Sequence, residues 1–235
     1  FGFCYLTFHI DIHNRRIFFM TPSPLTSLSR AILKKYNPSI IAIAGSVGKT
    51  ATKEACFFVL KEKFKVRKTE ENFNTANVMP FAIIGVRPGL HPIARFFLAF
   101  LKAMWLIVIR SKRYPQILIL EFGAESPGEI SEFLTLVTPT VGILTAIDNE
   151  RQENFQKFSQ LISEKRKIIE TLPRDGHAVL NFDEEISYSI AEKTNAKVVS
   201  YGVNKKAVAL KAEEQKVMTK DGKSGLYFKL LYKGT

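Results

Sequence analysis

Cysteine is scarce in this chain of 235 residues, which holds only Cys4 and Cys56. Two cysteines cannot build a disulfide framework, so a disulfide-stabilised secreted scaffold is excluded and a reducing compartment fits best. Clusters of cysteine and histidine with metal-ligand spacing are also missing. His9 and His13 lie four residues apart with no cysteine or carboxylate cluster beside them, and we interpret them as structural.

Long apolar runs, repeats and low-complexity tracts are absent as well. Residues 1–20 are rich in aromatic side chains but broken by charges, and they lack the layout of a signal peptide. They are either the end of an upstream membrane segment or a strand of a missing domain. The most apolar segment, 96–109, falls short of the roughly 18 residues that a membrane span needs, and it contains Lys102. We interpret it as a core or interface helix, with a helix on the membrane surface as the alternative, because Arg95 and Arg110 flank it.

The charge balance is strongly positive, with 34 lysine and arginine residues against 22 acidic ones and a net charge of +12. This balance favours anionic partners: nucleotides, sugar phosphates, an acidic membrane surface or nucleic acid. Nucleic acid is not expected, because the basic residues are scattered and no nucleic-acid-binding motif occurs. The length is enough for one or two domains with a real core. The first residue is Phe1, so we expect the chain to be a piece of a longer protein.

A phosphate-binding loop is the strongest single motif. The apolar run 40–44 leads into Gly45-Ser46-Val47-Gly48-Lys49-Thr50, and helical spacing follows. Backbone N–H groups of such a loop and the N-terminus of its helix attract phosphate, while the lysine contacts the outer phosphates and the threonine hydroxyl a magnesium ion. The usual pattern has glycine where this chain has Ile43. The loop is therefore a shortened version of the motif.

Apolar strands alternate with helical segments along the chain, which predicts an α/β fold with a doubly wound, mostly parallel sheet. In the helix at 50–64 we expect Ala55, Phe58, Val59 and Leu60 to face the core. An antiparallel hairpin with a tight turn at Asp221-Gly222 is predicted to end the chain. Besides 40–44, the predicted strands are 66–69, 116–121, 141–145, 178–182 and 197–201, and the other predicted helices are 25–36, about 129–136 and about 155–172.

Glu121 follows directly on the apolar strand residues 117–120. A carboxylate at the carboxyl end of a buried parallel strand is where an enzyme with a phosphate loop holds magnesium. We therefore pair Glu121 with Thr50 as a predicted magnesium site.

Taken together, these stretches resemble the Mur ligases of peptidoglycan synthesis, most closely the branch that adds D-alanyl-D-alanine to a UDP-muramyl tripeptide. The resemblance runs in register over about residues 30–235. It rests on 45–54, on Lys68-Thr69 with Asn72-Phe73-Asn74, on 120–124 with 127–130, on Glu164-Lys165, on Leu172-Pro173 with Asp175-Gly176, and on 178–183.

The resemblance implies an ATP-dependent amide ligase with Mg²⁺ that works in the cytoplasm on UDP-muramyl peptide and D-alanyl-D-alanine through an acyl phosphate. Residues 25–235 would form its central ATP-binding domain, incomplete at the C-terminal end and inactive alone. Residues 1–24 would be an apolar segment and linker left from an upstream domain. Peripheral contact with the inner face of the membrane, through 96–109 or through the N-terminal segment, is a further expectation.

The resemblance also implies roles for individual residues. Lys49 and Lys165 would be catalytic, and most family members carbamylate the lysine at the place of Lys165 to support a second magnesium ion. The alternative for Lys165 is a solvated helix lysine within the run Lys165-Arg166-Lys167. Metal ligands would be Thr50, Glu121 and Lys165. ATP would be bound by Gly45, Ser46, Val47, Gly48, Lys49, Thr50, Asn74, Asn181 and Asp183.

Three positions depart from the family pattern: Arg151 where a histidine ligand is usual, Ala146 and Thr75 where asparagines are usual. Arginine stays protonated and cannot bind a metal. Glu150 or Glu153 replaces the histidine, or the second metal is lost, or Arg151 clamps phosphate. Arg151 and the apolar segment 96–109 leave a degenerate nucleotide-binding module open as an alternative function. A second alternative is a related ligase for another acid, of the folylpolyglutamate type, although Thr52-Lys53-Glu54 and 121–124 argue against it.

Overall fold

The structure, a computed structural model, describes residues 9–11, 16–18, 24–70, 75, 78–123, 126–148, 155, 157–204, 208–220 and 223–232. The strands are β1 (His9–Asp11), β2 (Arg16–Phe18), β3 (Ser39–Ala44), β4 (Val66–Lys68), β5 (Ile117–Glu121), β6 (Val141–Leu144), β7 (His177–Asn181), β8 (Lys197–Gly202), β9 (Leu210–Lys220) and β10 (Lys223–Tyr232). The helices are α1 (Pro24–Tyr36), α2 (Lys49–Leu60), α3 (Met79–Ile84), α4 (Pro92–Val108), α5 (Glu129–Leu136), α6 (Phe158–Glu170) and α7 (Glu185–Ala191).

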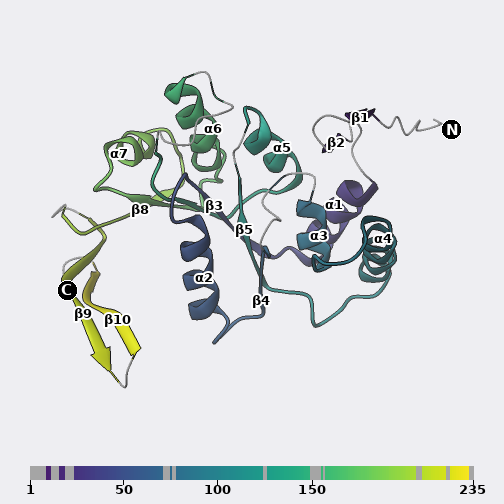
Figure 1. The fold of residues 1–235 in the computed structure, drawn as a ribbon, viewed down its shortest axis with the longest axis horizontal. Helices are drawn as coiled ribbons and strands as arrows, with labels where there is room; N and C mark the ends of the chain where they lie inside the picture. Colours follow the sequence, from purple (N-terminus) through teal and green to yellow (C-terminus); the bar gives the residue numbers. More distant parts are fainter. Residues whose placement is uncertain are drawn as a thin grey trace.

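An eight-stranded sheet in the order β10-β9-β8-β7-β6-β3-β5-β4 forms the centre of the chain, and only β10 is antiparallel to its neighbour (Figure 1). The predicted α/β fold and the antiparallel pairing of the terminal hairpin are confirmed, whereas its predicted turn at Asp221-Gly222 lies outside the described residues. The chain leaves β3 towards β4 on one side, whereas β6 leads to β7 on the other. Such a reversal opens a crevice at the carboxyl ends of the strands, where ligands bind in sheets of this kind. The phosphate loop lies at this point.

Alternate residues of the central strands face two different helical layers. Ile41, Ile43, Ile119 and Ile143 form one cluster, packed against Cys56, Phe57 and Leu60 of α2. Their neighbours in sequence, such as Ala42, Leu118 and Leu120, belong to the larger cluster on the other face. That cluster also holds apolar side chains of α1, α3, α4, α5, α6 and α7. Helices therefore cover both faces of the sheet, and the face under α2 is the smaller.

The predicted core face of α2 is confirmed for Leu60 and wrong for the other three residues. Val59 is 73% exposed and Phe58 56%, and Ala55 is exposed too. The helix instead turns Lys53, Cys56, Phe57 and Leu60 to the sheet. The spacing of these four residues is helical, but one of them is a lysine, so a purely apolar pattern selects the neighbouring stripe.

Helices α3 and α7 were not predicted, since each is only one to two turns long. The other predicted elements are present, with ends shifted by a few residues. Among the described residues, no helix is long and apolar enough to span a bilayer. The strands β1 and β2 pair with each other within the segment 1–24, whose origin as a remnant of another domain stays a prediction.

A buried carboxylate joins α5 to α6. Glu164 of α6 accepts a hydrogen bond of 2.8 Å from the Ile130 N–H in the first turn of α5, and its other oxygen contacts Lys167 at 2.6 Å. Burial alone would raise the pKa of Glu164. The Lys167 ammonium and the N–H groups of Gly128 and Ile130 outweigh burial and lower that pKa. The carboxylate also suits the positive end of the α5 dipole.

We expect Glu164→Ala to lower the free energy of unfolding by about 1–3 kcal/mol, because a buried N–H loses a charged acceptor. Chemical denaturation measures this loss. Since folding lowers the pKa of Glu164, its stabilisation is present above the unfolded pKa and fades as the pH falls through the folded one. The gap between wild type and variant should therefore shrink in acid. Glu132→Ala, at an exposed position of α5, is the control, and equal losses in the two variants would contradict the assignment.

Candidate active site

The loop after β3 is fixed to the end of β6. The Ser46 N–H donates to the Ala146 carbonyl at 2.7 Å, and the Ser46 hydroxyl donates to the Asp148 carbonyl at 3.2 Å. Gly45 lies so close to this segment that a Cβ there would be 1.8 Å from the Thr145 hydroxyl oxygen. Gly48 has φ of +84°, in the left-handed region. Glycine is required at both positions, for space at Gly45 and for conformation at Gly48.

Helix α2 begins at Lys49, directly after this loop. The first N–H groups of a helix have no partner within it and carry the positive end of the helix dipole. The Lys49 ammonium lies beside them and donates to the Ser46 carbonyl at 3.2 Å. The loop therefore presents a lysine and the N-terminus of a helix at the carboxyl edge of the sheet, an arrangement that attracts phosphate.

Thr50 and Lys53, one turn apart on α2, both contact the carboxylate of Glu121 at the end of β5. The Thr50 hydroxyl lies 3.2 and 3.3 Å from the two carboxylate oxygens, and the Lys53 ammonium lies 2.9 Å from one of them. The ion pair is buried, with side-chain exposures of 3% for Lys53 and 8% for Glu121. The Glu121 N–H donates to the Thr69 hydroxyl, which ties the end of β5 to the end of β4.

Lys165 of α6 reaches the same loop from the other side. It is 3% exposed, and its ammonium donates to the Gly45 carbonyl at 2.7 Å. Burial and the nearby Lys49 ammonium lower its pKa to about 8. The alternative of a solvated helix lysine is therefore wrong. The ammonium groups of Lys49, Lys53 and Lys165 thus gather around the loop and the Glu121 carboxylate, which makes this part of the site rich in positive charge.

A family model, the Mur ligase middle domain, matches residues 106–233, more than half of the chain. The chain belongs to the Mur ligase family. The matched residues include Glu121, Lys165, Asn181 and Asp183. The phosphate loop lies outside the matched range, so its assignment rests on its own sequence and geometry.

The chain is also similar in sequence to part of the length of characterised Mur ligases. The UDP-N-acetylmuramoyl-tripeptide–D-alanyl-D-alanine ligase of Bacillus subtilis is 27% identical over 177 residues, which cover 74% of this chain and 33% of that protein. The Mycobacterium leprae enzyme of the same name is 27% identical over 161 residues, covering 68% of this chain and 26% of that protein. The chain thus spans between a quarter and a third of the length of these relatives.

Solved Mur ligase structures share the fold. The MurF ligase of Thermotoga maritima, in complex with ADP, superposes with a TM-score of 0.69 at 21% identity, covering 96% of this chain and 45% of that one. A MurF structure from Acinetobacter baumannii gives 0.67 at 19% identity, covering 94% and 45%. At these identities the likeness concerns the fold alone.

Thr50 and Glu121 fit a magnesium ion. Two ligands at neighbouring corners of an octahedron with bonds of about 2.1 Å lie roughly 3.0 Å apart, close to the 3.2 Å between the Thr50 hydroxyl and the nearer Glu121 oxygen. The described residues contain no group of three or more histidine, cysteine or acidic side chains that could hold a metal. Magnesium bound with few protein ligands takes the rest from water and substrate phosphates. The pair Thr50–Glu121 therefore suits a magnesium ion that takes its other ligands from water and phosphate.

Asn181 and Asp183 lie at the same edge of the sheet, at the end of β7, two strands from β3. The Asn181 side-chain oxygen accepts the Asp183 N–H at 3.0 Å, and the Asp183 carboxylate accepts the N–H groups of Val203 and Asn204. These bonds join the ends of β7 and β8. The predicted role of the two residues in binding ATP stays a prediction. Asn74, Glu150, Arg151 and Glu153 lie outside the described residues.

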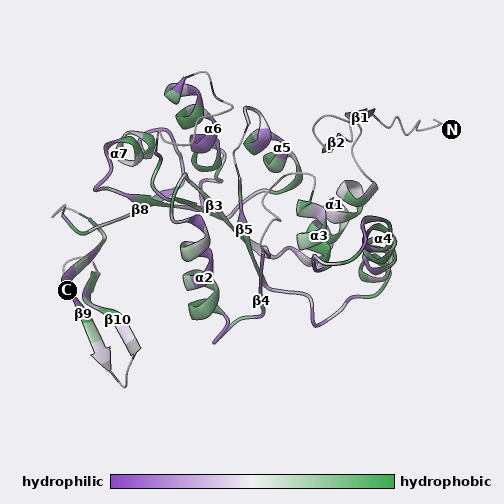
Figure 2. Cartoon of the chain, viewed as in Figure 1, coloured by the Kyte–Doolittle hydropathy of each residue, from purple (hydrophilic) through white to green (hydrophobic). Residues whose placement is uncertain are grey.

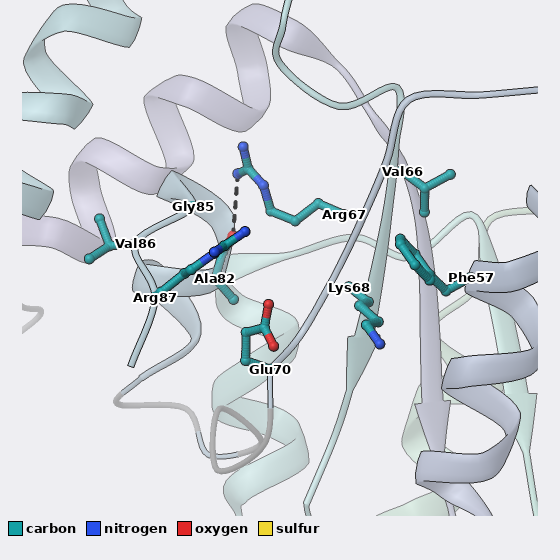
Figure 3. A pocket seen from close by; sticks show the side chains of 9 residues that line it. All are labelled: Phe57, Val66, Arg67, Lys68, Glu70, Ala82, Gly85, Val86 and Arg87. Atoms are coloured by element: carbon teal, nitrogen blue, oxygen red, sulfur yellow. Dashed lines mark hydrogen bonds between the residues drawn. The ribbon is translucent and has the colours of Figure 1, made fainter. Parts of the chain in front are cut away.

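A cavity of about 280 Å³ lies away from this site, between α2, β4 and the end of α3 (Figure 3). Its most buried charged group, Arg67, donates to the Ile83 carbonyl at 2.6 Å and lies over the Tyr114 ring. Lys68 pairs with Glu54. These polar groups are occupied within the fold: Arg67 caps the C-terminal end of α3. We therefore regard the loop at the edge of the sheet, and not this cavity, as the candidate active site.

Lys53 is the site residue that sequence reasoning missed. A polar residue three positions after Thr50 on a helix shares its face, and that signal, next to a strand ending in Glu121, would have identified it. We expect Lys53→Met to cost about 3–5 kcal/mol of stability, because it leaves a buried carboxylate unpaired. The double variant Lys53→Met/Glu121→Gln should recover part of this loss in denaturant titrations.

The matched control is Lys68→Met, which breaks the more exposed pair with Glu54. We expect it to cost at most about 1 kcal/mol. If Lys53→Met is no more damaging than Lys68→Met, the buried pair does not hold α2 on the sheet.

Proposed function

We propose that the chain is the ATP-binding part of an amide ligase of peptidoglycan precursor synthesis, joining D-alanyl-D-alanine to UDP-N-acetylmuramoyl-tripeptide. The observation that carries this proposal is the Thr50–Glu121 contact beside Lys49 in a shortened glycine loop, in a chain related to ligases of that name. The ADP bound to the related Thermotoga maritima ligase supports ATP as the nucleotide.

The reaction proceeds in two steps. A substrate carboxylate oxygen attacks the γ-phosphorus of ATP, and the bond from that phosphorus to the β-phosphate oxygen breaks, giving an acyl phosphate and ADP. The D-alanyl-D-alanine amine then attacks the acyl carbon, and the tetrahedral intermediate loses a proton and expels phosphate to leave the amide. Both partners of the first step are anions, so the barrier depends on positive charge near the transferred phosphoryl group.

Different residues of the chain contribute to this phosphoryl transfer in different ways. Lys49 and the first turn of α2 stabilise the charge that develops on the phosphoryl oxygens. Thr50 and Glu121 would hold Mg²⁺, which supplies charge neutralisation and orients the phosphates. Lys53 holds the Glu121 carboxylate in place. Gly45 and Gly48 keep the loop backbone close to the phosphates.

The domain arrangement is also a proposal. Residues 25–235 form a central ATP-binding domain that is incomplete at its C-terminal end, and residues 1–24 are a remnant of an upstream domain. The UDP-sugar and the amine would be bound by parts of the protein outside this chain, which alone would bind nucleotide without turnover. Because its substrates would be UDP-linked precursors and ATP, the protein would work in the cytoplasm. Peripheral membrane contact, through 96–109 or the N-terminal segment, stays a prediction.

We expect Lys49→Met to lower the rate of phosphate release about 1,000-fold. Opposite unit charges about 4 Å apart contribute roughly 4 kcal/mol at an effective dielectric of about 20, and each 1.4 kcal/mol is a factor of ten. The assay uses the longer protein that contains this chain, with ATP, UDP-muramyl tripeptide and D-alanyl-D-alanine. Lys63→Met, at an exposed lysine after α2, should leave the rate unchanged.

The same assay decides between the alternatives. If the wild-type protein binds ATP but releases no phosphate, the proposed ligase activity is rejected and a nucleotide-binding module is favoured. Phosphate release that needs a different acid would favour a related ligase, of the folylpolyglutamate type. Release that needs both proposed substrates supports the function proposed here.

We further propose that Lys165 is carbamylated. Burial beside Lys49 and a pKa of about 8 support this, because a neutral amine is the form that attacks CO₂. The nitrogen bonds to the carbon of CO₂ and releases a proton, which leaves an anion next to the Lys49 cation. The remaining N–H could still donate to the Gly45 carbonyl. Like charges in a buried site are thereby replaced by opposite ones.

In ¹³C-bicarbonate, we expect the wild-type protein to show a carbamate carbon resonance by NMR that Lys165→Arg lacks and Lys167→Arg retains. The resonance should grow as the pH rises from 7 through about 8, because the Lys165 ammonium loses its proton in this range. A spectrum without the resonance at any pH, or one that Lys165→Arg leaves unchanged, would contradict carbamylation.

A further inference from the structure

We propose that the outer face of α4 binds the surface of a lipid bilayer that carries anionic headgroups. This inference develops the membrane contact through 96–109 that belongs to the proposed function, and its test does not depend on ligase activity. Helix α4 lies at the periphery of the fold, on α1 and α3 and away from the phosphate loop (Figure 1).

Helix α4 consists mostly of hydrophobic residues (Figure 2), and every exposed side chain between Phe96 and Ile109 is apolar. Leu101 is 66% exposed and Val108 75%, values that a side chain of the core does not have. Monomeric proteins rarely expose a large continuous apolar surface without using it for binding. The exposed apolar residues of the helix are Ile93, Phe97, Leu98, Phe100, Leu101, Met104, Trp105 and Val108.

The one charged residue within 96–109 does not interrupt this face. Lys102 points inwards and donates to the Gly85 carbonyl at 2.6 Å, after the end of α3. Burial and the charges of Arg67 and Arg87 lower its pKa. Lys102 interrupts the apolar run in the sequence, but its side chain points into the fold. The outer face therefore carries no charge between Phe96 and Ile109.

Helix α4 cannot rotate to hide this face, because its inner side is fixed to α1. Ala99, Ala103 and Leu106 are buried there. Lys35 of α1 donates to the carbonyl of Ile107 at 2.7 Å, and the Tyr36 hydroxyl donates to that of Ile109 at 3.0 Å. The last carbonyls of the helix are therefore bound by α1, and the apolar face is a fixed part of the surface.

The charges around this face select an anionic partner. No acidic residue occurs between residues 72 and 120. Arg87 and His91 are exposed before the helix, and Arg110, Lys112 and Arg113 are exposed after it. Each lysine or arginine near an anionic bilayer contributes about 1 kcal/mol, or roughly fivefold in affinity. A second copy of the chain would bring a second basic segment of the same kind to the interface, which charge repulsion disfavours.

The helix would lie along the bilayer surface and not across it. Its 17 residues make it roughly 25 Å long, shorter than a membrane span, and its inner side is occupied. An apolar face bordered by basic residues is the arrangement of interfacial helices, which bury that face at the boundary of headgroups and acyl chains.

Trp105 provides a direct test, because it is the only tryptophan in the chain and is 48% exposed on α4. We expect the chain to cosediment with phosphatidylcholine–phosphatidylglycerol vesicles, with a blue shift of Trp105 emission and quenching by brominated acyl chains. Pure phosphatidylcholine vesicles should bind at least tenfold more weakly. Arg110→Gln and Arg113→Gln should each weaken binding to the anionic vesicles about fivefold.

Phe97→Glu/Leu101→Glu should abolish vesicle binding, whereas the control Val217→Glu/Leu226→Glu on the exposed terminal hairpin, with the same change of charge, should retain it. Circular dichroism checks that all variants are folded; if the Glu pair is not, Phe97→Ser/Leu101→Ser replaces it. Three results would overturn the proposal: no binding to anionic vesicles, equal binding to neutral ones, or dimers in sedimentation equilibrium that Phe97→Glu/Leu101→Glu dissociates.

Discussion

The arrangement of the candidate active site depends on the buried ion pair of Lys53 and Glu121. Neither group can be left alone at this depth, so each fixes the position of the other. Through this pair α2 is held on the end of β5, and the Thr69 hydroxyl holds the same residue from β4. The Thr50 hydroxyl then faces the carboxylate without any further contact being needed. The contact that the proposed magnesium site needs is thus held in place by an ion pair and a hydrogen bond within the fold.

Basic side chains of this protein occur in two different environments. Around the loop, Lys49, Lys53 and Lys165 lie in a partly dehydrated site beside Glu121, where a polyphosphate would be attracted strongly. Beside α4, Arg110, Lys112 and Arg113 stand in water at the border of an apolar surface, where each acts weakly and salt would screen it. The net charge of +12 sums the basic residues of both environments, so this total alone does not identify the binding partner.

Much of the fold follows from local pattern. The apolar strands, the glycine loop, the position of Glu121 and the terminal hairpin were all predictable, because strand burial and turn chemistry are properties of short segments. The inward direction of Lys102 and the buried face of α2 were not. Both depend on partners distant in sequence: Gly85 for Lys102, and Glu121, 68 positions along the chain, for Lys53. A hydrophobic pattern counts lysine as polar and therefore predicts that Lys53 and Lys102 face the solvent.

The two-sided burial of β3 has a consequence for how the protein can change. Ile41 and Ile43 of β3 pack against α2, whereas Ile40, Ala42 and Ala44 pack against the larger helical layer. Gly45 directly follows β3 and has no space for a side chain. One residue inserted or deleted in β3 would exchange the two faces and turn the loop away from Thr145. The connection around 87–91, exposed throughout, has no such restriction. Changes of length should therefore accumulate beside α4 while the phosphate loop keeps its number of residues.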